Sequence, residues 1–219
     1  MANNIPRQGF KFAYNLYGKS EAQVLAYSAA AARGTNGEIF IGDAVALTSG
    51  YVVPFISGGN CVGIVVGIAK ALDTTTSQSA TAAMNAAPPY DPTNLQQRSL
   101  ATADAGWVYV IPAGGNVFTC LNIAVTTIAQ VGNVGISVVG TTGTAIAAAD
   151  AHGIITGAAG YTGNSNMAVS TSLTTSKDVS VVGISNIFVG GTNSNGGQND
   201  PASANAQVLV LFRTPCFAQ

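Results

Sequence analysis

Short apolar runs separated by turn residues recur along this chain. Runs such as 39–41, 63–69, 106–111 and 207–212 are rich in β-branched and aromatic residues, which are enriched in strands. Glycine, asparagine, serine and proline stand between the runs, as in the Ser-Gly pair at 49–50. Many short strands with turn signals between them are typical of all-β proteins. The sequence therefore predicts an all-β fold, a β-barrel or a jelly-roll-like β-sandwich with long loops.

Three segments make more specific predictions. The run 63–69 is apolar without interruption, a pattern of strands that are buried on both faces. Pro54 ends the run before it or places that run at a sheet edge, because proline cannot donate a hydrogen bond to a neighbouring strand. Residues 21–32 are the one candidate for a helix of ordinary length. Their alanines favour a helix, whereas Val24 and Tyr27 fit a strand equally well, and both alternatives remain open.

The chain divides into an arm and a body. Residues 1–20 are predicted to form an extended N-terminal arm and residues 21–219 a β-rich body, with a split into two β subdomains near residue 121 left open. Within the body, residues 73–100 are predicted to form a long loop, and such loops are usually functional or linkers. A single helical turn would fit residues 144–151.

Aromatic and basic residues are concentrated in the predicted arm. Four aromatic side chains and two cations lie within eleven positions, and the aromatic residues at 10, 12 and 14 alternate, so an extended strand would place those three on one face. Arginine, tyrosine and phenylalanine are enriched in interface cores. We therefore expect residues 5–18 to dock on a neighbouring subunit or shell; the alternative is an ordinary first strand that completes its own sheet. The candidate interface residues are Arg7, Phe10, Phe12, Tyr14 and Tyr17.

Residue types that support catalysis or metal binding are scattered along the chain. His152 is the one histidine, and no Gly-x-Ser-x-Gly motif occurs, so neither a serine nucleophile elbow nor a histidine-rich zinc site is indicated. The Gly-Lys-Ser at 18–20 resembles the end of a phosphate-binding loop, but Ala13 stands where that motif needs glycine. Three cysteines do not make a disulfide framework and are interpreted as small apolar residues. These are Cys61, Cys120 and Cys216.

The acidic residues are interpreted as turn residues rather than as catalytic groups or metal ligands. No two of the nine have the spacing of a catalytic pair or a calcium-binding loop. Asp43 and Asp178 are interpreted as turn residues at the starts of strands. The sequence predicts no catalytic residue, no metal ligand and no cofactor, and therefore no enzyme.

The scarcity of charge sets limits on function. Of 219 residues, 8 are basic and 9 acidic, so that 8% of the chain is charged, against about 25% in typical proteins. With 47% hydrophobic residues, the chain is too apolar for disorder, and a net charge of −1 argues against nucleic-acid binding. No apolar stretch is long enough to span a membrane, and no secretory signal opens the sequence. We expect a protein that is made in the cytoplasm and covers its weakly charged surface by binding partners.

The order of elements along the chain also supports a resemblance. The segments that carry it are 7–10, 16–18, 39–45, 63–67, 105–110, 181–184 and 206–213. Their strand-and-turn pattern resembles that of the auxiliary head proteins of tailed bacteriophages, the decoration or cement proteins that bind outside an assembled capsid shell. The resemblance covers residues 5–213.

The resemblance implies a structural role on the capsid. It implies a β-rich subunit without catalytic activity whose oligomers clamp neighbouring major capsid proteins. We expect self-association, with a trimer favoured over a dimer, and a place on the virion surface after synthesis in the host cytoplasm. The alternative is a carbohydrate-binding β-module of a phage fibre or adhesin. Aromatic residues spread over a groove would favour that alternative, whereas their concentration in the arm favours the structural role.

Overall fold

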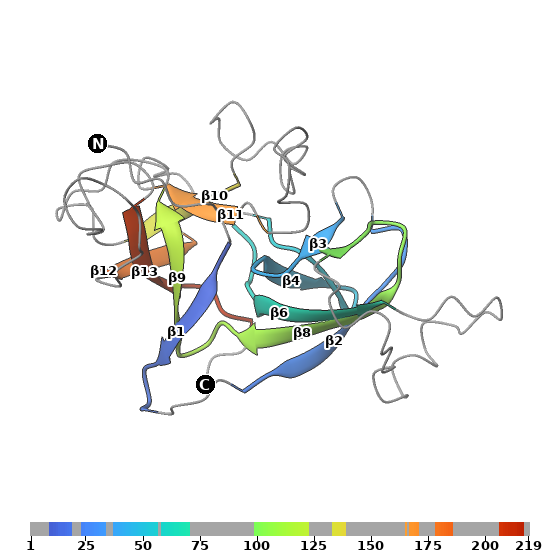
Figure 1. Cartoon of the computed structure of the whole chain (residues 1–219), viewed down its shortest axis with the longest axis horizontal. Helices are drawn as coiled ribbons and strands as arrows, with labels where there is room; N and C mark the ends of the chain where they lie inside the picture. Colours follow the sequence, from blue (N-terminus) through green and yellow to red (C-terminus); the bar gives the residue numbers. More distant parts are fainter. Residues whose placement is uncertain are drawn as a thin grey trace, which may run out of the picture.

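The computed structural model of the chain is built of strands (Figure 1). It describes residues 9–18, 23–33, 37–56, 58–70, 99–122, 133–138, 165, 167–170, 178–185 and 206–216. Thirteen strands and no helix occur in these residues, so the all-β prediction is confirmed. Consistent with this, a search of the same residues finds no helix that could cross a membrane.

Six strands form the first sheet, sheet A, in the order β1-β9-β11-β10-β12-β13. β9 also pairs with β13, so the sheet curls back on itself. The contact of β9 with β11 is a single register pair, Asn122 opposite Val169, and the sheet therefore curls without closing into a barrel. The strands are β1 (Lys11–Asn15), β9 (Asn116–Asn122), β10 (Asn133–Val138), β11 (Met167–Ser170), β12 (Val179–Ile184) and β13 (Ala206–Phe212).

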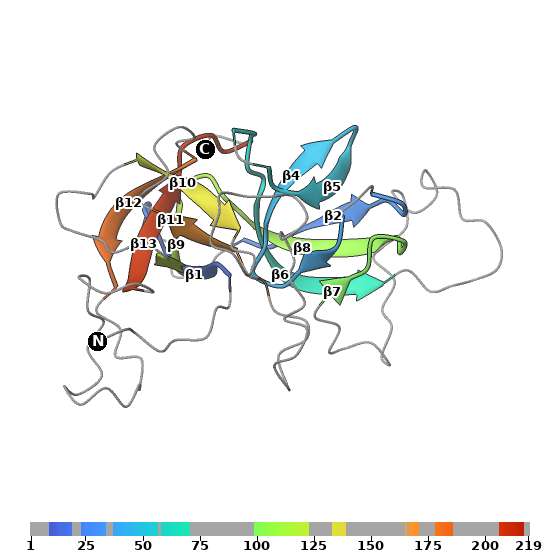
Figure 2. The same ribbon diagram turned by 90° about the horizontal axis from the view of Figure 1, so that it is seen from above.

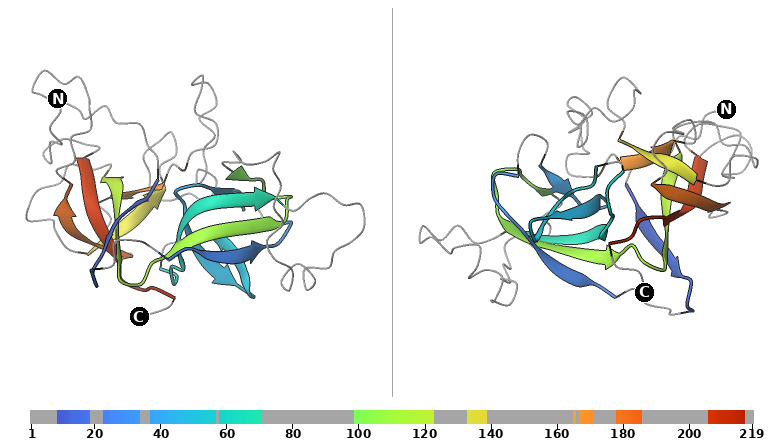
Figure 3. Two further views of the ribbon diagram at one scale, coloured as in Figure 1. Left: turned by 60° about the horizontal axis from the view of Figure 1, so that its bottom comes forward. Right: turned by 180° about the vertical axis from the view of Figure 1, so that it is seen from behind.

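Sheet B contains five strands in the order β2-β8-β6-β4-β5. Its two outer strands, β2 and β5, contact each other, so this sheet curls as well. A two-stranded sheet, sheet C, pairs β3 (Ile39–Phe40) with β7 (Ser99–Leu100). Figures 2 and 3 show sheets A and B side by side. The strands of sheet B are β2 (Leu25–Ala29), β4 (Ala44–Thr48), β5 (Tyr51–Pro54), β6 (Gly63–Lys70) and β8 (Gly106–Pro112).

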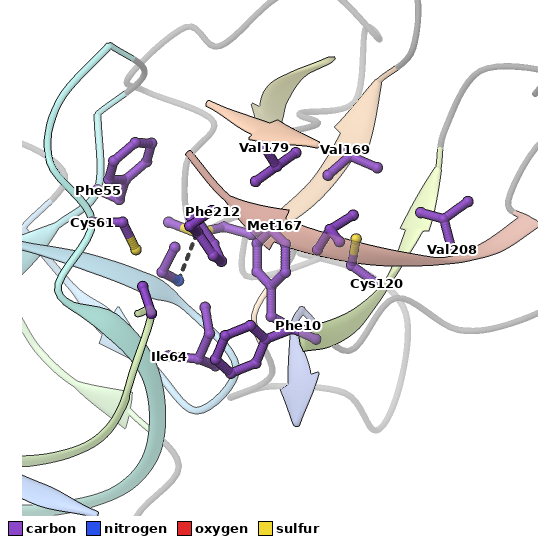
Figure 4. Close-up of a cluster of buried hydrophobic side chains, with 14 of the residues drawn as sticks. Phe10, Phe55, Cys61, Ile64, Cys120, Met167, Val169, Val179, Val208 and Phe212 are labelled. Carbon is purple, nitrogen blue, oxygen red and sulfur yellow. Dashed lines mark hydrogen bonds between the residues drawn. The ribbon is translucent and has the colours of Figure 1, made fainter. Parts of the chain in front are cut away.

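Two hydrophobic cores stabilise this arrangement. The first core contains side chains from both sheets (Figure 4), and its largest members include Phe10, Phe55, Phe118, Met167 and Phe212. The second core contains side chains of sheets B and C. Neighbouring residues in and next to the strands of sheet B pack in different cores, because successive side chains of an extended chain point to opposite faces. The paired members of the first and second cores are Ala44 and Val45, Cys61 and Val62, Ile64 and Val65, and Ile111 and Val110.

This double burial explains the uninterrupted apolar run at 63–69. Ile64 and Val65 are fully buried on opposite faces of β6, as the sequence predicted. The prediction fails further along, because a bulge between Val65 and Gly67 in the pairing with β8 leaves Val66 38% exposed. Pro54 ends β5, an outer strand of sheet B, which confirms the edge assignment.

The candidate helix at 21–32 contains a strand instead. β2 pairs with β8 through the register Leu25–Val110 to Ala29–Gly106, and Tyr27 packs against the second core. The adjacent apolar strand β8 therefore decides between the two alternatives that the sequence left open, since local preference yields to strand pairing.

Arg33 connects the end of β2 to the segment before β8. Its guanidinium donates hydrogen bonds of 2.5–3.0 Å to five main-chain carbonyls. Because two of these carbonyls lie between β2 and β3 and three lie at the end of β7 or after it, the side chain holds two distant segments together, and its planar fork suits that task. The acceptors are Ala30, Gly37, Leu100, Ala101 and Asp104.

The chain starts in sheet A with β1, runs through sheets B and C from β2 to β8, and returns to sheet A at β9. Residues 113–115 connect β8 and β9, whereas residue 121, where the sequence left a division open, lies inside β9. The division also differs from a simple split of the chain, because β1 at the N-terminal end belongs to sheet A. Of the predicted loop 73–100, only β7 lies within the described residues, and the predicted turn at 144–151 lies outside them.

Candidate functional site

The N-terminal strand β1 is an edge strand of its own chain's sheet. It pairs antiparallel with β9, from Lys11 opposite Thr119 to Asn15 opposite Asn116. The Asn15 side-chain amide donates to Asn116 Oδ1 at 2.7 Å, and the Leu16 N–H donates to a carbonyl of the β8–β9 connection at 2.9 Å. The part of the predicted arm that the structure describes is therefore fixed to the body before any partner binds.

The aromatic residues of this segment fall into two groups. Phe10 is 2% exposed, and its ring centroid lies 5.5 Å from that of Phe212 in the first core. Phe12 packs against the same core and meets Phe118 edge-on at 6.3 Å. These two residues complete the hydrophobic core of their own chain, which was the alternative to intermolecular docking.

The other group remains exposed. Tyr14 is 44% exposed and Tyr17 61%, and Leu16 between them is 52% exposed. The expectation that Phe10, Phe12 and Tyr14 share one face is wrong for Tyr14. A bulge between Phe12 and Tyr14 shifts the register with β9 and breaks the two-residue period.

We name Tyr14, Leu16 and Tyr17 the N-terminal patch. Asn15 shapes it, because its side-chain oxygen accepts from the Tyr17 N–H at 2.8 Å and its carbonyl accepts from the Gly18 N–H at 3.3 Å. The structure thus divides the predicted interface residues into buried Phe10 and Phe12, exposed Tyr14 and Tyr17, and Arg7, which lies outside the described residues. Leu16 was missed, although its place in the turn that ends the aromatic run was a usable signal.

Two buried carboxyl groups lie where sheets A and B meet. Asp43 and Asp178 directly precede β4 and β12, which confirms the prediction that they mark strand starts, yet they are 0% and 3% exposed. Asp178, directly ahead of β12 in sheet A, accepts the N–H of Gly58 from the connection between β5 and β6 of sheet B at 2.7 Å. Asp43 accepts the Phe40 N–H at 2.8 Å through Oδ2. Burial raises the pKa of Asp43 to about 8, although hydrogen bonds with Ser165 and Phe40 oppose the shift.

The remaining candidates for chemistry are not brought together. In the part of the chain that the structure describes, no three His, Cys, Asp or Glu side chains are arranged to hold a metal ion. Cys61 and Cys120 lie in the first core, where burial raises the pKa of both thiols, so they remain protonated at neutral pH. His152 and the Lys19–Ser20 pair lie outside the described residues.

Comparisons with protein families, with curated proteins and with solved structures found no significant match for this chain.

Proposed function

We propose that this chain is a structural virion protein that binds the outside of a bacteriophage capsid and stabilises it by clamping neighbouring major capsid proteins. The observation that carries the proposal is the N-terminal patch, three exposed side chains at the end of edge strand β1 and in the turn that follows it. The strand-and-turn resemblance to auxiliary head proteins and the low charge of the chain support the same role.

The patch has the properties of a preorganised contact. Tyrosine is enriched both in interfaces and among the residues that contribute most to binding. Burying one such side chain contributes about 1.5–3 kcal/mol. Ordering a free arm would cost about 1–2 kcal/mol per residue. Pairing with β9 already orders residues 11–15 of this chain, so more of the burial energy is available for binding.

The backbone of β1 offers a second kind of contact. No described strand pairs with the edge of β1 that faces away from β9. Edge strands present main-chain N–H and C=O groups to which an extended segment of another protein can pair. A capsid protein or another copy of this chain could bind there, and we extend the proposal to self-association as a trimer on the shell.

Exposed aromatic residues are arranged less well for the carbohydrate-binding alternative. Among the described aromatic residues, the exposed ones are Tyr14 and Tyr17, and both lie at one end of a single strand. A carbohydrate-binding groove would be expected to contain aromatic rings from several elements. The clustering favours a protein contact.

The proposal is tested by replacing the patch. The variant Tyr14→Ser, Leu16→Ser, Tyr17→Ser is compared with a matched control, Val24→Ser, Ile56→Ser, Val182→Ser, which replaces three other exposed apolar residues. Binding is measured by cosedimentation with shells of the encoding phage that were assembled without this protein. Far-ultraviolet circular dichroism verifies the fold of both variants.

The patch variant is expected to bind the shells roughly a hundredfold more weakly than the unmodified chain, since each tenfold corresponds to about 1.4 kcal/mol. The control is expected to bind as the unmodified chain does. If the patch variant binds as tightly as the unmodified chain, the patch is not part of the interface. Failure of the unmodified chain to bind any shell would contradict the proposed function itself.

A further inference from the structure

The segment 41–44 connects the two large sheets. It precedes and begins β4 of sheet B, and main-chain and side-chain groups of sheet A and of the residue before β1 bond to it. We call this region the sheet joint. Its hydrogen bonds run from Phe10 N–H to Gly42 O (2.8 Å), from Ser165 N–H to Ile41 O (3.3 Å), and from Ala44 N–H to Met167 Sδ (3.2 Å), the last being the dashed line of Figure 4.

Asp43 lies at the centre of the sheet joint. Its carboxyl group accepts the Phe40 N–H from sheet C and is hydrogen-bonded to Ser165, which precedes β11 of sheet A. Ser165 in turn accepts the Met167 N–H at 3.1 Å through Oγ. One fully buried carboxyl group, directly ahead of β4 of sheet B, therefore bonds to a strand of sheet C and to a residue that leads into sheet A.

We propose that Asp43 is a proton-dependent latch between the sheets. The protonated carboxylic acid holds the sheet joint closed, and loss of its proton places a negative charge in an apolar interior and loosens the joint. Nothing in this proposal depends on the capsid role, because it concerns the isolated chain.

Among the described residues around Asp43, the groups that favour its negative charge are Ser165 and Phe40, which form hydrogen bonds with it. Strand β4, the described side chains of β6, strand β11 and residues 9–10 contain no titratable residue. The titratable group that acts on Asp43 is Glu38, ahead of β3, and its negative charge opposes ionisation of Asp43. The pKa of Glu38 is itself raised by burial, against the effects of Ser99 and Arg33. No cation is among the described groups that shift the pKa of Asp43, and a charge placed in apolar surroundings is costly.

The sign of the effect follows from the two pKa values. The pKa of Asp43 is about 8 in the folded chain and ordinarily 3.8, so between these values the folded chain binds a proton that the unfolded chain has lost. Stability therefore falls as the pH rises through this window. When the folded chain binds one proton more than the unfolded chain, the equilibrium constant of unfolding increases about tenfold per pH unit.

The latch is tested on the full chain by denaturant unfolding between about pH 5 and about pH 8. The variant Asp43→Asn keeps the shape and neutral charge of the protonated acid, and Glu38→Gln is the matched control. Asp43→Asn is expected to lose the tenfold change per pH unit, whereas Glu38→Gln is expected to retain it above the range in which Glu38 ionises. Parallel pH profiles for Asp43→Asn and the unmodified chain would overturn the proposal.

A second measurement needs no variant to fold. Hydrogen exchange of the unmodified chain, corrected for the intrinsic pH dependence, compares peptides of the joint with peptides of β8 below and above about pH 8. The latch predicts that protection falls above this pH at the Phe10, Ala44 and Ser165 amides and is retained in β8. Protection at the joint that does not change with pH, or that changes equally everywhere, would overturn the latch.

Discussion

Neighbouring residues on β4, β6 and β8 pack in different cores. This packing restricts which side chain fits at single positions. At Gly63, the first residue of β6, an added Cβ would lie 2.0 Å from the Ile111 carbonyl oxygen and 2.7 Å from a Val110 methyl group. The close approach of β6 to β8 at this point allows Ile64 and Val65 to reach the two cores. The backbone contact therefore leaves room for glycine alone.

The change Gly63→Ala is expected to lower the free energy of unfolding by about 3 kcal/mol, the upper end for overpacked cores, because backbone atoms must move. The matched control is Gly183→Ala on β12, where the nearest atom to an added Cβ is a Leu209 methyl group at 3.4 Å; its effect is expected to be small. Denaturant unfolding measures both. Equal stability of the two variants would contradict the close packing of β6 on β8.

The positions of strands and turns could be predicted from the sequence better than the pairing of one strand with another. Turn chemistry placed the hairpin between β4 and β5 correctly: Ser49 and Gly50 have φ angles of +51° and +83°, as a two-residue hairpin turn requires. Helix and strand could not be separated at β2, because the partner that decides, β8, lies about eighty positions away in the sequence. The same holds for the bulge that turns Tyr14 outward, which depends on the register with β9.

The candidate site could be predicted only in part, because contacts between distant segments also decide which of its residues are buried. Concentrated aromatic residues marked the N-terminal segment, yet only contacts with Phe118 and Phe212 separate the buried half from the exposed half. Asp43 was recognisable as a turn residue. Its burial could not be foreseen, because segments distant in the sequence pack around it, and its hydrogen-bond partner Ser165 lies more than a hundred positions away.

Deleting residues 1–18 tests the role of β1 as an element. The deletion removes Phe10 from the first core and the pairing of β1 with β9. Loss of a buried phenylalanine alone costs about 3–5 kcal/mol, a large share of the roughly 5–15 kcal/mol that stabilises a typical protein. We expect a strongly lowered melting temperature in thermal unfolding.

The N-terminal patch variant serves as the control for this deletion. Its three substitutions lie on exposed side chains, where replacements usually change stability little, so it is expected to melt close to the unmodified chain. A deletion variant that also melts at the unmodified temperature would show that β1 contributes nothing to its own chain's core.

In the molecule as a whole, the two curled sheets share the first core, and the buried carboxyl groups of Asp43 and Asp178 lie where they meet. This construction leaves few charges for the surface, since 8% of the chain is charged and Asp43 and Asp178 are buried. A weakly charged surface favours association. The proposed place on a capsid shell, among many copies of major capsid protein, would cover such a surface.

The proposed structural role on the outside of the capsid is tested by quantitative mass spectrometry of purified virions of the encoding phage, before and after protease treatment of the intact particles. We expect the chain to be present in a fixed ratio to the major capsid protein, with a copy number of the same order, and protease to remove it from intact particles while the major capsid protein remains. Absence from virions, the few copies typical of a tail fibre, or complete protection inside the shell would contradict the proposed role.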